Sequence, residues 1–144
     1  MADNSPLVMA VADLAYSGGD IAEMLKLILH NKLQIDLKIV SLAEVMTTVK
    51  QLKPNLLIIG DRPLLENDVM RERWQAAGEL MGSDIVKALK SDPESKDIPI
   101  LMLEGSAIIE KVAQECGADG YLMVPFGPQE FLDTIRPWLM ADKT

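Results

Sequence analysis

Short apolar runs alternate with amphipathic segments along most of this chain. Most of the runs are continuously apolar, as expected for strands that are buried on both faces of a parallel sheet. Five strands are predicted, at Leu7–Ala12, Ile35–Val40, Asn55–Gly60, Ile98–Leu103 and Tyr121–Val124. The alternation of these strands with helical segments predicts an α/β fold in which helices cover the sheet.

Local chemistry marks the ends of the predicted helices. Asp20 and Ser41 each precede a glutamate by three residues, which is the spacing of a capping box and predicts two helix starts. Gly117 is expected to end one later helix, and Pro137 to bend or end another. Helices after the third strand are predicted at about Ser83–Lys90, Ser106–Cys116 and Pro128–Arg136.

The connection after the third predicted strand is irregular. Asp61–Met81 is far longer than the roughly two to six residues usual between a strand and its helix. Apolar residues recur in it at helical spacing, at Met70, Trp74, Ala77 and Met81. We predict an additional helix in an insertion of about residues 62–81. Its Trp and Met residues fit either a surface that docks a partner or packing onto the domain's own helices.

The length and composition predict one cytoplasmic domain, residues 1–144 with a core at 7–139. No apolar stretch approaches the roughly 20 residues that cross a bilayer, so we expect neither a membrane span nor a signal peptide. The single cysteine, Cys116, cannot form an internal disulfide. The net charge of −8, without an obvious basic cluster, argues against nucleic-acid binding.

Three stretches of the sequence resemble receiver domains of two-component response regulators. They are KPNLLIIGD (Lys53–Asp61), KSDPESKDIPILML (Lys90–Leu103) and ECGADGYLMVPFGPQEFL (Glu115–Leu132). The resemblance covers the chain from Leu7 to Leu139. It implies a flavodoxin-like (βα)5 doubly wound sheet with strand order 2-1-3-4-5, interrupted here by the extra helix between the third strand and third helix.

The same resemblance implies that the phosphorylation pocket is degenerate. The family's phosphoacceptor aspartate matches Gly60, and its lysine on the fifth strand matches Val124. Its hydroxyl residue after the fourth strand matches Glu104, and its two adjacent acidic residues match Ala12 and Asp13. Glycine offers no nucleophile, and valine offers no countercharge for a phosphoryl group. Only Asp13 keeps the chemistry of the family.

Three sharper interpretations of these residues stay open. Asp61, one step beyond Gly60, could act as a substitute phosphoacceptor, although strand alternation points it to the opposite face; the ordinary interpretation is a solvated loop carboxylate. Glu104 could imitate a phosphorylated state, or be a surface glutamate. Asp13, Asp61 and Glu104 could together hold a cation if they converge, although no metal is expected.

The resulting hypothesis is a stand-alone pseudo-receiver, not an enzyme, that binds protein partners without phosphorylation or a cofactor. The expected contact face consists of helix Ser106–Cys116, strand Tyr121–Val124 and helix Pro128–Arg136, and the partner is another protein or a second copy in a homodimer. The residues expected to border it are Tyr121, Lys111, Ala113 and, in the insertion, Trp74. The rival hypotheses are a response regulator phosphorylated on Asp61 and a flavodoxin-like small-molecule binder. The second lacks a glycine-rich phosphate cradle.

Overall fold

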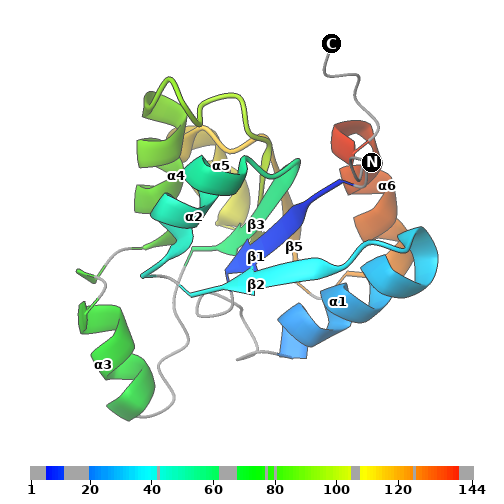
Figure 1. Ribbon diagram of the computed structural model, residues 1–144, viewed down its shortest axis with the longest axis horizontal. Coiled ribbons are helices and arrows are strands. Elements are labelled where there is room, and N and C mark those ends of the chain that lie inside the picture. Colours follow the sequence, from blue (N-terminus) through cyan, green and yellow to red (C-terminus); the bar gives the residue numbers. More distant parts are fainter. Residues whose placement is uncertain are drawn as a thin grey trace.

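Five parallel strands form one sheet in the order β2-β1-β3-β4-β5, which confirms the predicted doubly wound topology (Figure 1). The computed structural model describes residues 6–11, 20–41, 43–61, 68–76, 78–79, 81–104, 108–124 and 126–139. The strands are β1 (Val8–Val11), β2 (Leu37–Val40), β3 (Leu56–Gly60), β4 (Ile100–Glu104) and β5 (Gly120–Met123). β1, β3 and β4 are buried at every position.

Helices cover both faces of the sheet, and a separate apolar core lies under each face. One core joins alternate strand residues such as Leu57 and Ile59 to the helices α2, α4 and α5. The other joins the intervening residues, such as Leu56 and Ile58, to α1 and α6. This alternation is the period-two geometry of strands, and it decides which face each strand-end side chain reaches. The helices are α1 (Asp20–Leu33), α2 (Val45–Leu52), α3 (Asp68–Ala76), α4 (Gly82–Ser91), α5 (Ile109–Cys116) and α6 (Pro128–Leu139).

Several predicted helix ends are corrected by the structure. α2 begins at Val45, and the Ser41 hydroxyl donates to the Glu44 side chain at 2.7 Å instead of capping backbone N–H groups. Asp20 is the first helical residue of α1. Pro137 does not end α6, which continues to Leu139.

The predicted end of the helix before β5 is correct. Gly117 follows α5 with φ of +89°, the left-handed conformation that glycine adopts at helix ends at little cost. Its N–H donates to the carbonyl of Ala113 at 3.1 Å.

The inserted helix exists, but it is shorter than predicted. α3 ends at Ala76, and Met81 precedes α4 instead of continuing the α3 stripe. Met70 and Ala77 lie outside the side chains that the structure describes. Trp74 is half-buried and packs against the core beneath α2, α4 and α5, although α3 itself stands apart from the other helices (Figure 1). The tryptophan therefore anchors the insertion to the domain.

A half-buried lysine joins two of the sequence stretches that resemble receivers. The Nζ atom of Lys90, at the end of α4, lies 2.6 Å from Oδ2 of Asp119. It also donates to the carbonyls of Ile98 at 2.8 Å and Lys96 at 3.2 Å. Asp119 Oδ2 accepts the N–H of Ile100 at 2.8 Å as well. This network ties the end of α4 to the starts of β4 and β5.

Candidate functional site

The candidate site lies at the carboxyl edge of the sheet, where doubly wound folds bind their ligands. β3 ends there at Gly60 and β4 at Glu104, with Gly60 paired to Leu103 in the sheet register. Ile59 and Met102 face the core under α4 and α5. Because side chains alternate along a strand, Asp61 and Glu104, each two residues further on, are directed to that same face.

Asp61 is tied to the N-terminus of α4. Its side chain is 8% exposed, and its Oδ1 accepts the N–H of Ser83 at 3.0 Å. Its backbone carbonyl accepts the N–H of Gly82 at 2.7 Å. A helix N-terminus carries unpaired N–H groups and partial positive charge, so a carboxylate there is stabilising. The interpretation of Asp61 as a solvated loop residue was wrong, because Asp61 is buried and its carboxylate caps the N-terminus of α4.

The close approach of α4 to β3 requires a glycine at position 82. A Cβ atom built on Gly82 would lie 1.8 Å from the carbonyl oxygen of Gly60 and 3.0 Å from the Cα of Asp61. Both contacts are with backbone, which cannot rotate away as a side-chain tip would. The start of α4 is therefore packed directly against the backbone of Gly60 and Asp61 at the end of β3.

The remaining positions of the expected pocket offer little to a phosphoryl group. Gly60 is buried and supplies only backbone. Val124 is half-buried against the core under α1 and α6, and its N–H donates to the carbonyl of Glu104 at 2.8 Å. Ala12 and Asp13 lie outside the described residues.

Glu104 is not the exposed loop residue that its position suggested. It is 8% exposed at the end of β4, and it interacts with neighbouring groups. Asp61 and Glu104 thus place two largely buried acidic residues at neighbouring strand ends. Within the described residues, no group of three or more His, Cys, Asp or Glu is arranged to hold a metal ion.

Asp61 can be tested as a helix cap by two substitutions, of which only asparagine keeps the size of the side chain. Asp61→Ala removes the acceptor and the charge, so we expect the free energy of unfolding to fall by about 1–2 kcal/mol. Asp61→Asn keeps an amide oxygen that can accept from Ser83, so it should lose less than half as much. Urea denaturation measures both changes. Equal losses for the two variants would contradict the capping role.

Cys116 is a core residue and not a reactive thiol. Its Sγ lies 3.5 Å from Sδ of Met102, and its side chain is buried beneath α5. Burial raises the pKa of the Cys116 thiol above its usual value, so the nucleophilic thiolate is disfavoured at neutral pH.

The residues predicted for a partner face are divided by the structure. Tyr121 on β5 is 39% exposed, and Lys111 on α5 is exposed beside Glu115, with 4.0 Å between their charged atoms. Ala113 must be removed from the face, because it is 2% exposed and packs into the core under α5. Trp74 is half-buried against that core. Met123 is 51% exposed, and the sequence did not predict it as part of the face.

Comparison with known proteins finds partial matches to chemotaxis proteins. Over 53 residues the chain is 40% identical to the chemotaxis protein CheY1 of Helicobacter pylori, a match covering 35% of this chain and 43% of that protein. Over 55 residues it is 34% identical to CheY-3 of Vibrio cholerae, covering 37% and 42%. The matches span less than half the length of either curated relative. No protein-family model matches the chain.

Solved structures establish the receiver fold over nearly the whole chain. The chemotaxis response regulator CheY4 of Vibrio cholerae superposes with a TM-score of 0.70 at 23% identity, covering 94% of this chain and 99% of that one. The receiver domain of a histidine kinase from Syntrophus aciditrophicus gives 0.71 at 19% identity, covering 97% of each. The receiver domain of the sensor kinase PA1611 from Pseudomonas aeruginosa, solved with magnesium in its cleft, gives 0.70 at 13%, covering 95% and 99%. These likenesses show the fold: a doubly wound receiver-type domain.

No described helix is both long enough and apolar enough to span a bilayer.

Proposed function

We propose that this chain is a receiver-like signalling module that binds protein partners without being phosphorylated. The proposal rests on the two residues at the carboxyl end of β3, Gly60 and Asp61. Gly60 stands where receivers carry their phosphoacceptor, and the adjacent Asp61 carboxylate is buried and bonded to the N-terminus of α4. Val124 supplies no ammonium group to neutralise a phosphoryl group.

Two physical costs oppose phosphorylation of Asp61, the main rival hypothesis. Phosphorylation would remove the negative charge of the carboxylate and so weaken the hydrogen bond that its Oδ1 accepts from the N–H of Ser83. The added dianion would also approach the largely buried residue Glu104 at the neighbouring strand end. The rival nevertheless makes a distinct prediction that can be measured.

We expect no covalent phosphoryl group on the protein after incubation with acetyl phosphate and Mg²⁺, measured by intact-mass spectrometry. Asp61→Asn, treated in parallel, is the matched control because it keeps the size of the side chain and removes the acceptor. A phosphoryl adduct on the natural sequence that is absent from Asp61→Asn would overturn the proposal in favour of the rival.

The surface best suited to a partner lies on edge strand β5 and the adjoining start of α5. We define the β5 surface as Ile108, Tyr121 and Met123, which are 46%, 39% and 51% exposed. Tyr121 and Met123 are two residues apart on β5 and so share one face of the strand. Exposed large apolar side chains are a feature of interaction sites. β5 is also the last strand in the sheet order, so one side of its backbone has no strand neighbour within the sheet.

Replacing both Tyr121 and Met123 with lysine should abolish partner binding through the β5 surface without unfolding the domain, because both side chains are exposed. Chemical crosslinking in the host, followed by mass spectrometry, measures heteromeric partners, and sedimentation velocity measures a homodimer. Leu27→Lys is the control, since Leu27 is 59% exposed on α1. Partners that persist in the double variant would place the contact elsewhere, for example on α3 around Trp74.

A further inference from the structure

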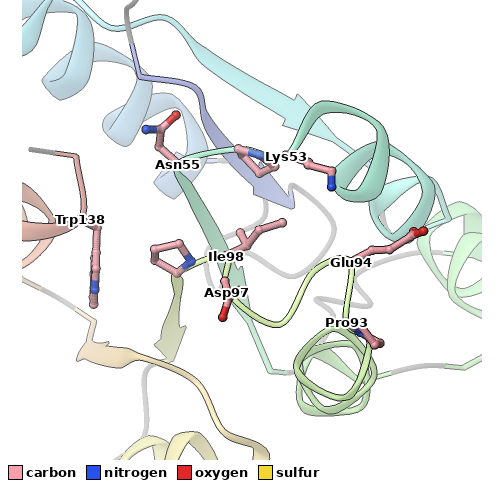
Figure 2. A pocket seen from close by; sticks show the side chains of 9 residues that line it. Lys53, Asn55, Pro93, Glu94, Asp97, Ile98 and Trp138 are labelled. Carbon is pink, nitrogen blue, oxygen red and sulfur yellow. The ribbon is translucent and has the colours of Figure 1, made fainter. Parts of the chain in front are cut away.

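A groove crosses the amino edge of the sheet, the edge opposite to Asp61 and Glu104 (Figure 2). Its volume is about 480 Å³, within the range of small-molecule and peptide sites. The turn between α4 and β4, the start of β3 and the last turn of α6 form its walls. Its principal lining residues are Pro54, Pro93, Pro99, Trp138, Glu94 and Asp97.

The turn that forms one wall is held in place by several polar contacts. The Ser95 hydroxyl, which is buried, donates to the carbonyl of Leu89 at 2.8 Å. Nζ of Lys50 lies 2.5 Å from Oδ2 of Asp92. Their hydrogen bond lowers the pKa of Asp92 and raises the pKa of Lys50, so the pair stays ionised at neutral pH. The Lys90 ammonium group fixes the far end of the turn. This wall is preformed, which reduces the entropy lost on binding.

The facing wall is the indole ring of Trp138. A Cβ atom on Gly120 would lie 2.8 Å from Cη2 of Trp138, so the ring rests directly on the first residue of β5. Trp138 is half-buried there and also packs against the core under α1 and α6. The glycine thus makes room for an aromatic platform whose position is set by the sheet.

The chemistry of the lining selects a particular kind of ligand. The indole of Trp138 provides an aromatic face of the kind that packs against polyproline II segments, and the proline rings add rigid apolar surface. Among the described residues, neither Glu94 nor Asp97 forms a salt bridge, and both are exposed. With Lys53, the third charged lining residue, they leave a net charge of −1 (one positive and two negative). A cationic ligand matches this charge and can also contact the indole face.

We propose that this groove binds an extended, proline-containing peptide segment that carries Arg or Lys. The proline rings pack between Trp138 and the proline residues of the lining, and the cationic side chain lies near Glu94 and Asp97. A second copy of this chain would match the negatively charged groove less well than a cationic peptide, because the net charge of the chain is −8. The site is independent of the phosphorylation pocket and of the β5 surface.

The test uses the full chain and a ten-residue peptide of repeated proline-proline-arginine units, with blocked ends. Calorimetry measures affinity, and the NMR signal of the Trp138 indole N–H reports where the peptide binds. We expect saturable binding that shifts this signal and weakens as salt is added. Asp97→Lys and Trp138→Ala should each weaken binding by about tenfold, whereas Glu110→Lys on α5 should leave it within about twofold.

Two further peptides test separately whether binding needs the cationic side chain and whether it needs proline. A peptide with glutamate in place of arginine and one with glycine in place of proline should each bind at least about tenfold more weakly. Equal binding of either peptide, or an unchanged affinity in Asp97→Lys, overturns the proposal. Because Asp97 is exposed, that variant is expected to fold even if Trp138→Ala does not. If the peptide does not bind the groove, the proposed partner binding through Tyr121 and Met123 is not contradicted.

Discussion

Replacing Gly82 with alanine is expected to lower the free energy of unfolding by about 3 kcal/mol, measured by urea denaturation. The new methyl carbon would lie 1.8 Å from the Gly60 carbonyl oxygen, so the helix and strand backbones must move apart. This movement would also stretch the hydrogen bonds that Asp61 makes to the first turn of α4. The expected sign is opposite to helix propensity, which favours alanine over glycine by about 1 kcal/mol.

Gly127→Ala is the matched control for this prediction. A Cβ atom at Gly127 meets nothing within 4 Å, and its backbone is not in the left-handed region. We expect a change of less than about 0.5 kcal/mol, or a slight gain from reduced freedom of the unfolded chain. If Gly82→Ala lowers the free energy of unfolding no more than Gly127→Ala does, α4 does not pack as closely against the end of β3 as described.

Replacing Lys90 with methionine is expected to cost about 2–3 kcal/mol of stability. The change leaves the Asp119 carboxylate without its cation, and it removes the donor that now serves the carbonyls of Ile98 and Lys96. Losing one partner of a partly buried pair can cost more than the pair contributes in net terms, because the remaining charge is left without its partner. Asp119 is 36% exposed, so water offsets part of the loss, and the estimate is kept below the value for a fully buried pair.

Lys87→Met, on the exposed side of the same helix, should change stability by less than about 0.5 kcal/mol. A double-mutant cycle with Asp119→Asn then isolates the coupling between Lys90 and Asp119. Additive losses would mean that the lysine acts through its carbonyl contacts alone. A Lys90→Met protein as stable as Lys87→Met would show that the network is not structural.

The contacts of Lys90 and Asp119 give part of the receiver-type sequence pattern a structural role. Lys90 and Asp119 come from two of the stretches that resemble receivers, and in this structure their contacts hold the turn before β4 against the start of β5. Residues of the phosphorylation pocket serve chemistry and can be lost without unfolding the sheet. The fold and the pocket therefore need not change together.

Much of the fold could be predicted because its signals are local and repeated. Continuous apolar runs place five strands to within two residues at each end, and the left-handed glycine ends α5 as expected. Capping boxes failed as boundary signals, because the Ser41 hydroxyl finds the Glu44 carboxylate before the helix begins. The insertion was recognised from its length, but the apolar stripe through Met81 did not show where α3 stops and α4 starts.

The sequence by itself determined the doubly wound sheet, because the alternation of apolar runs and helical segments follows from residue type and order. Only the tertiary structure showed that Asp61 is a buried cap of α4, that Ala113 is in the core and that prolines meet Trp138 at the amino edge. Each of these facts depends on contacts between residues 20 or more positions apart. Such contacts are set by how helices pack on the sheet, which local pattern does not encode.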